Sequence, residues 1–379
     1  MKEKISQFYN KNYKKILFLP AIIIILCLVY LTFFYLQNGD IIHKDISLTG
    51  GTTITIDSNM SIAELHSKLV NKFPNIAISS ISDNSGKQIK LIIMVSEEPN
   101  KIKPELESYL NHPLNDENSS IEFTGSSLSN DFYNQLLRAV IFAFLLMAMV
   151  VFTVFGQSKK IKVYCFLLTI ISAKLTFPSS SFLNIIEIAG AIFLFFYSLY
   201  LSKEKKSRIY TLILIVAFIL FYIFPHYYLI IPVMIILFII YGAVSVPSMA
   251  VISCAFADIV MPLVVIDLMG IKISSAGIVA FLMLIGYSVD TDILLTSRVL
   301  NRKTDSVNKA IFGAFKTGST MTLTSIVSVS VGLIIIYSYQ SILNQIFTIL
   351  IIGLFFDLFN TWITNASLIK WYVERTKRQ

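Results

Sequence analysis

Charged residues are scarce in this chain of 379 residues: aspartate, glutamate, lysine and arginine together make up 14%, whereas 55% of the residues are hydrophobic. A water-soluble protein cannot bury that much apolar surface, so most of the chain is expected to lie in lipid. The formal net charge of +8 fits the rule that lysine and arginine collect at the cytoplasmic side of membrane segments. The basic balance therefore does not indicate nucleic-acid binding.

Cysteine and histidine are rare as well. The three cysteines lie in apolar runs, where packing is expected rather than a disulfide framework. The four histidines lack the spacing of metal ligands, so the sequence predicts no metal and no cofactor. It also lacks a nucleophile–base pair and a phosphate-binding glycine loop, and we do not expect an enzyme. The cysteines are Cys27, Cys165 and Cys254, and the histidines are His43, His66, His112 and His226.

The first long hydrophobic run covers residues 16–36 and follows Lys14 and Lys15. It is long enough to cross a bilayer, and it ends in polar residues rather than in the small residues of a signal-peptide cleavage site. We therefore expect a membrane anchor with the N-terminus on the cytoplasmic side.

Residues 37–135 are polar and have the periodicities of a small water-soluble domain. Ser61 and Glu64 have capping-box spacing before an amphipathic helix that Pro74 ends, and a second helix is expected over 104–110. Strands are expected at 52–57, 76–81, 89–95 and 120–124, with a hairpin turn at 83–86. The βαββαβ order predicts a ferredoxin-like sandwich outside the membrane.

From residue 136 onward the chain is almost entirely apolar. With the first anchor, ten spans are expected, and the basic breaks between them then fall on the same side as Lys14 and Lys15. Spans 163–178 and 209–225 are short, so one re-entrant or interfacial hairpin is an alternative. The nine later spans are 137–156, 163–178, 182–201, 209–225, 228–244, 248–269, 275–298, 312–337 and 345–369.

Five motifs follow one another along the chain. They are Asp-Ile-Ser-Leu-Thr-Gly-Gly-Thr at 45–52, Phe-Ala-Asp-Ile-Val at 256–260, Leu-Ile-Gly-Tyr-Ser-Val-Asp-Thr-Asp at 284–292, Lys-Thr-Gly-Ser-Thr-Met-Thr at 316–322 and Asp-Leu-Phe-Asn-Thr-Trp at 357–362. In this order the chain resembles the SecF subunit of the SecDF protein-export complex, and its Val-Asp-Thr-Asp form resembles the archaeal branch.

The resemblance implies an RND-like core of six helices with one extracytoplasmic domain after the first. It also implies a subunit that pairs with SecD beside the Sec translocon (SecYE-type) and helps exported polypeptides across the cell membrane. Proton flow is the proposed drive in bacteria, and both termini would be cytoplasmic. The core spans would be 16–36, 137–156, 248–269, 275–298, 312–337 and 345–369.

One departure from the family pattern is large: residues 158–245 hold about four extra spans where a short turn is typical. An even number preserves the orientation of the later helices. The expected divisions are 1–36 (N-terminus and first helix), 37–135 (ferredoxin-like domain), 136–157 (second core helix), 158–245 (inserted helices), 246–370 (four core helices) and 371–379 (basic tail).

A carboxylate inside a bilayer costs about 3 kcal/mol at a helix centre, so each one is a functional candidate. The family's functional aspartate aligns with Thr291 in the bacterial SecF pattern and with Asp290 in the SecD pattern, which this chain follows. The family's basic partner aligns with Lys316, which could equally be a snorkelling interfacial lysine. The proton-relay candidates are therefore Asp290, Asp258, Asp292 and Lys316.

Several of these residues have structural alternatives. Asp290 is one turn from Gly286, which leaves room for a close neighbour, whereas Asp292 lies about 200° around the helix from Asp290. Asp292 could instead pair with Arg298 near the interface. Asp258 could make a structural hydrogen bond. Asp357, with Asn360 one turn away, suggests a polar clasp between helices, for which Arg298 is a third candidate.

Two other functions stay open on sequence grounds. An RND-type half-transporter of a small molecule or lipid would share the same core helices, and a SecD chain would normally have a longer outer region.

Lys174 and Glu187 in the extra spans are more simply explained by snorkelling or by the span boundaries than by a pathway. Thr49-Gly50-Gly51 is expected to form the turn into the first strand.

Overall fold

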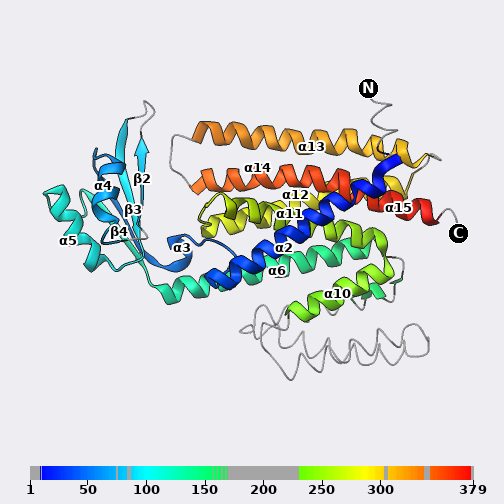
Figure 1. The fold of residues 1–379 in the computed structure, drawn as a ribbon, viewed down its shortest axis with the longest axis horizontal. Coiled ribbons are helices and arrows are strands. Elements are labelled where there is room, and N and C mark those ends of the chain that lie inside the picture. Colours follow the sequence, from blue (N-terminus) through cyan, green and yellow to red (C-terminus); the bar gives the residue numbers. More distant parts are fainter. Residues whose placement is uncertain are drawn as a thin grey trace, which may run out of the picture.

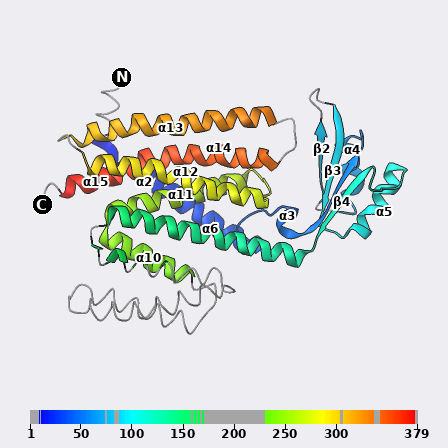
Figure 2. The same cartoon turned by 180° about the vertical axis from the view of Figure 1, so that it is seen from behind.

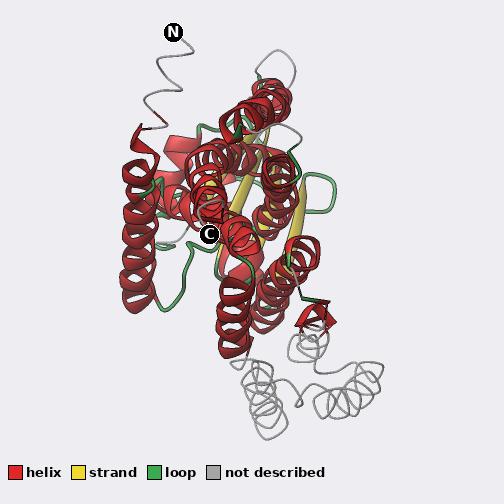
Figure 3. Ribbon diagram, turned by 90° about the vertical axis from the view of Figure 1, so that its right-hand side faces the viewer, coloured by secondary structure: helices red, strands yellow, loops and turns green. Residues whose placement is uncertain are grey.

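The computed structural model describes residues 11–73, 76–82, 87–156, 230–302, 306–336 and 342–376, together with Tyr9 and scattered positions between 158 and 169. A bundle of long helices and a small sheet domain lie end to end, with both termini at the end of the bundle away from the sheet (Figure 1). Viewed along the bundle, the strands lie behind the helices (Figure 3).

Six helices of the described residues are long and apolar enough to cross a membrane. They agree with the six expected core spans. The first runs over Lys11–Asn38 and includes α2 (Phe18–Asn38); the others are α6 (Ser126–Phe155), α11 (Val246–Leu268), α12 (Ser275–Leu300), α13 (Val307–Ile336) and the continuous run of α14 (Ile342–Asn360), η2 (Thr361–Asn365) and α15 (Ala366–Thr376).

The second helix begins earlier than expected. The apolar run predicts a start at residue 137, but α6 begins at Ser126. The polar first turns of α6 extend beyond the apolar run towards the sheet domain (Figure 1), and an apolar window does not detect such an extension.

The extra spans are described only in part. α10 (Ile230–Val244) corresponds to the span expected over 228–244. The spans expected over 163–178, 182–201 and 209–225, with Lys174 and Glu187, lie outside the described residues apart from a few positions.

The sheet domain follows the expected order of strands and helices. Its antiparallel sheet has the order β2-β3-β1-β4. The apolar residues of α4 and α5 pack on one face of the sheet (Figure 2). The elements are β1 (Gly51–Asp57), α4 (Ile62–Leu69), β2 (Ala77–Ser82), β3 (Gln88–Val95), α5 (Pro99–Leu110) and β4 (Ser119–Thr124).

Two local expectations in this domain are wrong. Ser61 stands at the N-cap of α4 but makes no side-chain cap hydrogen bond, and Glu64 pairs instead with Lys68 at 2.7 Å. α5 begins at Pro99 rather than at Pro104. A proline in the first turn costs no helical hydrogen bond, so Pro99 is a good first residue.

The Gly50–Gly51 turn into β1 is confirmed. The two glycines have φ values of 82° and 146°, and L side chains rarely adopt such a backbone. A Cβ at Gly50 would lie 2.6 Å from the Cα of Ser126, and one at Gly51 would lie 2.3 Å from the carbonyl oxygen of Val95. Glycine therefore lets the chain pass between the start of α6 and the end of β3.

The linker between α2 and β1 is tied to the bundle by several contacts. Tyr133 of α6 donates a hydrogen bond to Asp40 at 2.5 Å. The backbone of Ile273, in the turn between α11 and α12, exchanges hydrogen bonds with the linker at His43 and Asp45. A short helix, α3 (Ile46–Thr49), follows these contacts and was not expected from the sequence. The bundle thus determines where the sheet domain begins.

Candidate functional site

Three carboxylates from three helices are buried inside the bundle. Asp258 of α11, Asp292 of α12 and Asp357 of α14 are 1%, 0% and 1% exposed. We call these three residues the carboxylate cluster. No lysine, arginine or histidine of the described residues lies within ion-pair distance of any of them.

Asp258 links α12 and α14 to α11. Ser288 donates to its Oδ2 at 2.5 Å, and the amide nitrogen of Asn360 donates to its Oδ1 at 2.6 Å. Asn360, a candidate for a polar clasp between helices, thus joins α14 to α11.

Asp357 is held by hydroxyl groups from its own helix run and from two others. Thr291 of α12 and Thr361 of η2 donate to its Oδ1 at 3.1 and 3.3 Å, and Thr322 of α13 donates to its Oδ2 at 3.3 Å. Asp357 thus joins α12, α13 and α14.

Asp292 has one satisfied oxygen and one unsatisfied oxygen. The amide nitrogen of Asn365 donates to its Oδ1 at 2.8 Å, and its Oδ2 has no hydrogen-bond partner in the described structure. The alternative pairing with Arg298 is not formed, because Arg298 is exposed and donates to the carbonyl oxygen of Gly313 and to the hydroxyl of Thr317. Arg298 is also outside the buried clasp for which it was a candidate.

The π-helical segment η2 explains why one helix run supplies two asparagines to the cluster. In an α-helix Asn360 and Asn365 would point about 140° apart. The i→i+5 hydrogen bonds of a π-helix turn the later residue back towards the same face, and such segments often occur at functional sites. The sequence analysis missed Asn365; the signal was a dense polar run, Asn-Thr-Trp-Ile-Thr-Asn, inside an apolar span.

Two buried oxygen atoms in and beside the carboxylate cluster lack a hydrogen-bond donor in the described structure. They are the Oδ1 of Asn360 and the Oδ2 of Asp292. An unmet buried acceptor costs about 1–3 kcal/mol, so a proton or a cation would complete the cluster. Among the described residues, no group of three histidine, cysteine, aspartate or glutamate side chains is arranged to hold a metal ion.

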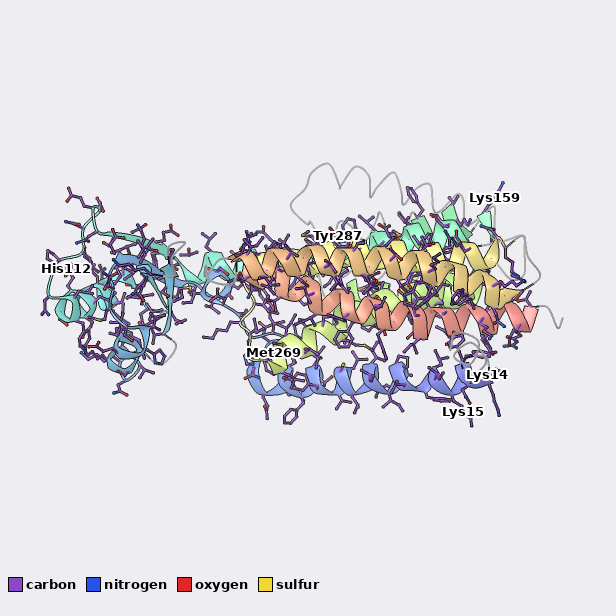
Figure 4. The ribbon with its side chains drawn as sticks, turned by 90° about the horizontal axis from the view of Figure 1, so that it is seen from above. Lys14, Lys15, His112, Lys159, Met269 and Tyr287 are labelled. Carbon is purple, nitrogen blue, oxygen red and sulfur yellow. The ribbon has the colours of Figure 1, made fainter. Side chains whose placement is uncertain are left out.

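Asp290 is on the opposite side of α12 from Asp292, as their spacing predicts. Asp290 is exposed, and so are Met283, Gly286 and Tyr287 on the same face. Figure 4 shows Tyr287 about halfway along the bundle. Nothing lies within 4 Å of the position of a Cβ on Gly286, so the close neighbour expected there does not come from the described part of this chain.

The exposed surface of α13 carries a row of hydroxyl groups among apolar side chains. Thr317, Thr320, Thr324 and Ser328 recur every three or four residues and therefore line one face, and all but the half-exposed Thr317 are exposed. Arg298 of α12 reaches this face at Thr317, at a distance of 3.0 Å. Lys316 of α13 is exposed and makes no ion pair with the carboxylate cluster.

We define the open face as the exposed side of α12 with Met283, Tyr287 and Asp290, together with the hydroxyl row of α13 (Thr317, Thr320, Thr324 and Ser328).

The prediction that the cysteines serve packing is consistent with the structure, since Cys27, Cys165 and Cys254 are all buried and free.

These features define a polytopic helical membrane protein with a buried polar cluster and a sheet domain at one end of its bundle. A family model described as protein export membrane protein SecD/SecF, C-terminal, matches residues 200–375. The protein-export membrane protein SecF of Methanocaldococcus jannaschii is 30% identical over 370 residues, which cover 96% of each chain. The chain belongs to the SecF family of protein-export membrane proteins.

Other relatives are similar over different lengths. SecF of Pyrococcus furiosus is 24% identical over 99% of this chain and 96% of its own. SecF of Haloferax volcanii is 46% identical over 129 residues, which cover 34% of this chain and 44% of its own. SecF of Pyrococcus furiosus thus matches this chain nearly end to end, whereas SecF of Haloferax volcanii matches about a third of it.

The fold resembles that of a solved SecDF structure. The crystal structure of SecDF, a translocon-associated membrane protein from Thermus thermophilus, matches 96% of this chain with a TM-score of 0.51 and 12% identity. The match covers 38% of the SecDF chain. This chain therefore has the fold of somewhat less than half of that protein.

Proposed function

We propose that this chain is the SecF half of a two-subunit SecDF-type assembly that assists protein export at the Sec translocon (SecYE-type). Its partner is a SecD-like chain, and its substrates are exported polypeptides. In this proposal the sheet domain, ferredoxin-like by its strand order, lies outside the cell and contacts the exported chain. Both termini are cytoplasmic, and residues 158–245 form additional membrane helices.

The distribution of charge supports this orientation. Lys11, Lys14 and Lys15 precede the first span, and the last span ends in the basic run 370–378. Both ends of the chain lie opposite the sheet domain (Figure 1). Lysine and arginine mark the cytoplasmic side of membrane proteins, so the sheet domain belongs on the other side.

The observation that carries the proposal is the open face with Asp290 in the middle of it. A carboxylate exposed to hydrocarbon is costly, whereas the same group facing a second helical bundle finds a partner. The hydroxyls of Thr317, Thr320 and Thr324 donate to carbonyl oxygens of α13 and add little to that cost. The SecDF chain to which this chain is similar contains more than twice the length matched here. A SecD-like bundle is therefore the occupant that we propose for the open face.

In this proposal the protein has two acidic sites for the proton. Asp290 lies in the seam with the SecD-like partner, and Arg298, about two turns further along α12, reaches the hydroxyl row of α13 at Thr317. The carboxylate cluster lies behind it, inside the SecF bundle, and is short of hydrogen-bond donors. A proton that crosses the membrane supplies about 2.3 kcal/mol per 100 mV, enough to bias a helix rearrangement of a few kcal/mol.

The test uses isosteric substitutions in the complex with its SecD-like partner. Asp290→Asn removes the charge in the seam and keeps the shape of the side chain. We expect export that depends on a pH gradient to fall to the level measured without the gradient, while the variant still co-purifies with the partner. Export into proteoliposomes with and without an imposed pH gradient measures this effect.

A matched control is Asp57→Asn in the sheet domain, because Asp57 is an exposed carboxylate outside the membrane. It should leave gradient-dependent export unchanged. Unchanged gradient-dependent export in Asp290→Asn would remove Asp290 from the relay. Failure of the wild-type chain to co-purify with any SecD-like subunit would contradict the two-subunit proposal itself.

A further inference from the structure

A crevice lies between the first helix and the last at the end of the bundle that holds both termini. It has a volume of about 470 Å³. The first helix lines it with Lys14, Leu17, Phe18 and Ala21, and the last span lines it with Leu368 and Trp371. The crevice is distinct from the carboxylate cluster and from the open face.

The crevice has a cationic end and an apolar end. Of the residues of the first helix that line the crevice, Lys14 is near the N-terminal end of the helix. Ala21 lies seven residues, or about 10 Å, further into the membrane span. Leu17, Phe18 and Leu368 line the stretch between them. A ligand that fits this gradient has a polar, anionic head and a hydrocarbon tail.

Two cations flank the polar end. The Nζ of Lys14 lies 5.9 Å from the ring centre of Tyr13, and the guanidinium of Arg375 lies 5.4 Å from the ring centre of Trp371. Both side chains are exposed, and no acidic side chain of the described residues lies within ion-pair distance of either.

The acidic group nearest to this end is already engaged. Glu374 accepts a hydrogen bond from Tyr13 at 2.7 Å and lies 3.9 Å from the Nζ of the buried Lys370. The charge of Lys370 offsets that of Glu374, so the mouth of the crevice keeps the positive charge of Lys14 and Arg375. Tryptophan and lysine at this level are typical of the boundary between hydrocarbon and headgroups.

We propose that this crevice binds one anionic phospholipid, with its phosphate between Lys14 and Arg375 and one chain along Leu17, Phe18, Ala21 and Leu368. Such a lipid would hold the first and last helices together at the crevice that both of them line. The proposal does not depend on the partner subunit or on the direction of export.

The test is native mass spectrometry of the purified full-length chain titrated with lipid in detergent. The probes are phosphatidylglycerol, which is anionic, and phosphatidylcholine, which has the same chains and no net charge. We expect phosphatidylglycerol to bind as one retained copy and more tightly than phosphatidylcholine. Each cation near the headgroup contributes a factor of about five in affinity, so Lys14→Gln with Arg375→Gln should weaken phosphatidylglycerol binding about 25-fold.

Lys15→Gln is the matched control because it removes the same charge one residue away. Lys15 does not line the crevice, because it lies about 100° around the helix from Lys14. Its effect should be less than two-fold. Ala21→Trp fills the apolar end without a change of charge and should lower the affinity for both lipids.

Three results would overturn the proposal: equal affinity for the two lipids, equal weakening by Lys14→Gln and Lys15→Gln, or full retention of phosphatidylglycerol by Ala21→Trp. The first two would mean that the basic end attracts anions without a site, and the third that the crevice is not where the chain of the lipid lies. Because wild-type protein supplies the lipid comparison, a poorly folded variant does not prevent the test.

Discussion

At the scale of single residues, the carboxylate cluster depends on a few amide and hydroxyl donors. Asn365 is the donor that holds Asp292, and it is itself completely buried. Because Asp292 already has one oxygen without a partner, Asn365 is the residue whose loss leaves the largest unmet demand for hydrogen bonds.

Asn365→Ala is expected to destabilise the protein by about 1–3 kcal/mol, since it leaves both carboxyl oxygens of Asp292 without a side-chain donor. Thermal unfolding of the detergent-solubilised chain measures the loss. Thr324→Ala is the control, because its exposed hydroxyl bonds only to the carbonyl oxygen of Met321 in its own helix, and an effect within about 0.5 kcal/mol is expected. Equal melting temperatures for the two variants would contradict the role given to Asn365.

Asp290 and Asp292 show how far sequence reasoning reaches at this scale. The helical period predicts that they face opposite ways, and they do. It does not say which of the two faces inward, because α12 has apolar residues all around it. The structure buries Asp292 because Asn365 meets that side of α12 and contacts both Asp292 and Thr296, and this packing is created only by the tertiary fold.

At the scale of elements, the junction of the sheet domain with the bundle depends on backbone that only glycine adopts. Gly51 has a φ of 146°, and a Cβ there would lie 2.3 Å from the carbonyl oxygen of Val95. The side chain of a larger residue would displace β1 from β3.

Gly51→Ala is expected to cost about 1–3 kcal/mol from backbone strain alone, with a further cost from the steric overlap. Hydrogen exchange should then be faster at the amides that pair β1 with β3. Gly125→Ala, where a Cβ meets nothing within 4 Å and φ is −63°, should leave exchange unchanged. Exchange as slow in Gly51→Ala as in the wild type would show that β1 does not depend on this turn.

The elements themselves were largely readable from the sequence, and their ends were not. Apolar runs locate the six spans because hydrocarbon requires them. They miss the polar start of α6 and the short helix α3, where contacts of the linker with the bundle decide the structure. They also miss η2, because a π-helical segment differs from an α-helix by one residue per turn and has no signature in hydrophobicity.

At the scale of the whole molecule, the charge distribution predicts a topology. His112 lies at the tip of the sheet domain, and Lys15 lies near the other end of the chain's long axis (Figure 4). The three native cysteines are buried, so they can be replaced by alanine to give a background for labelling.

In that background, His112→Cys should react with a membrane-impermeant maleimide in intact cells, whereas Lys15→Cys should react only after the membrane is opened. The two positions should differ in labelling because lysine and arginine near the N-terminus keep that end of the chain on the cytoplasmic side of the membrane. Labelling of Lys15→Cys in intact cells would reverse the proposed orientation.

The length of the chain is shared by some of its relatives. The SecF of Methanocaldococcus jannaschii matches it over 96% of both chains, whereas a match of 133 residues makes up 35% of this chain and 47% of the SecF of Methanolacinia petrolearia, which is therefore shorter. A chain of about this length is thus found in at least one relative.

The central claim is that the open face of α12 and α13 is covered by a SecD-like subunit. Photo-crosslinking in the membrane tests it most directly, with a photoreactive phenylalanine analogue placed at Tyr287 and, as the control, at Phe33, which is 59% exposed on α2. The account predicts a crosslink to the SecD-like subunit from position 287 and none from position 33. A crosslink from position 33 alone, or from neither position while the two subunits co-purify, would contradict it.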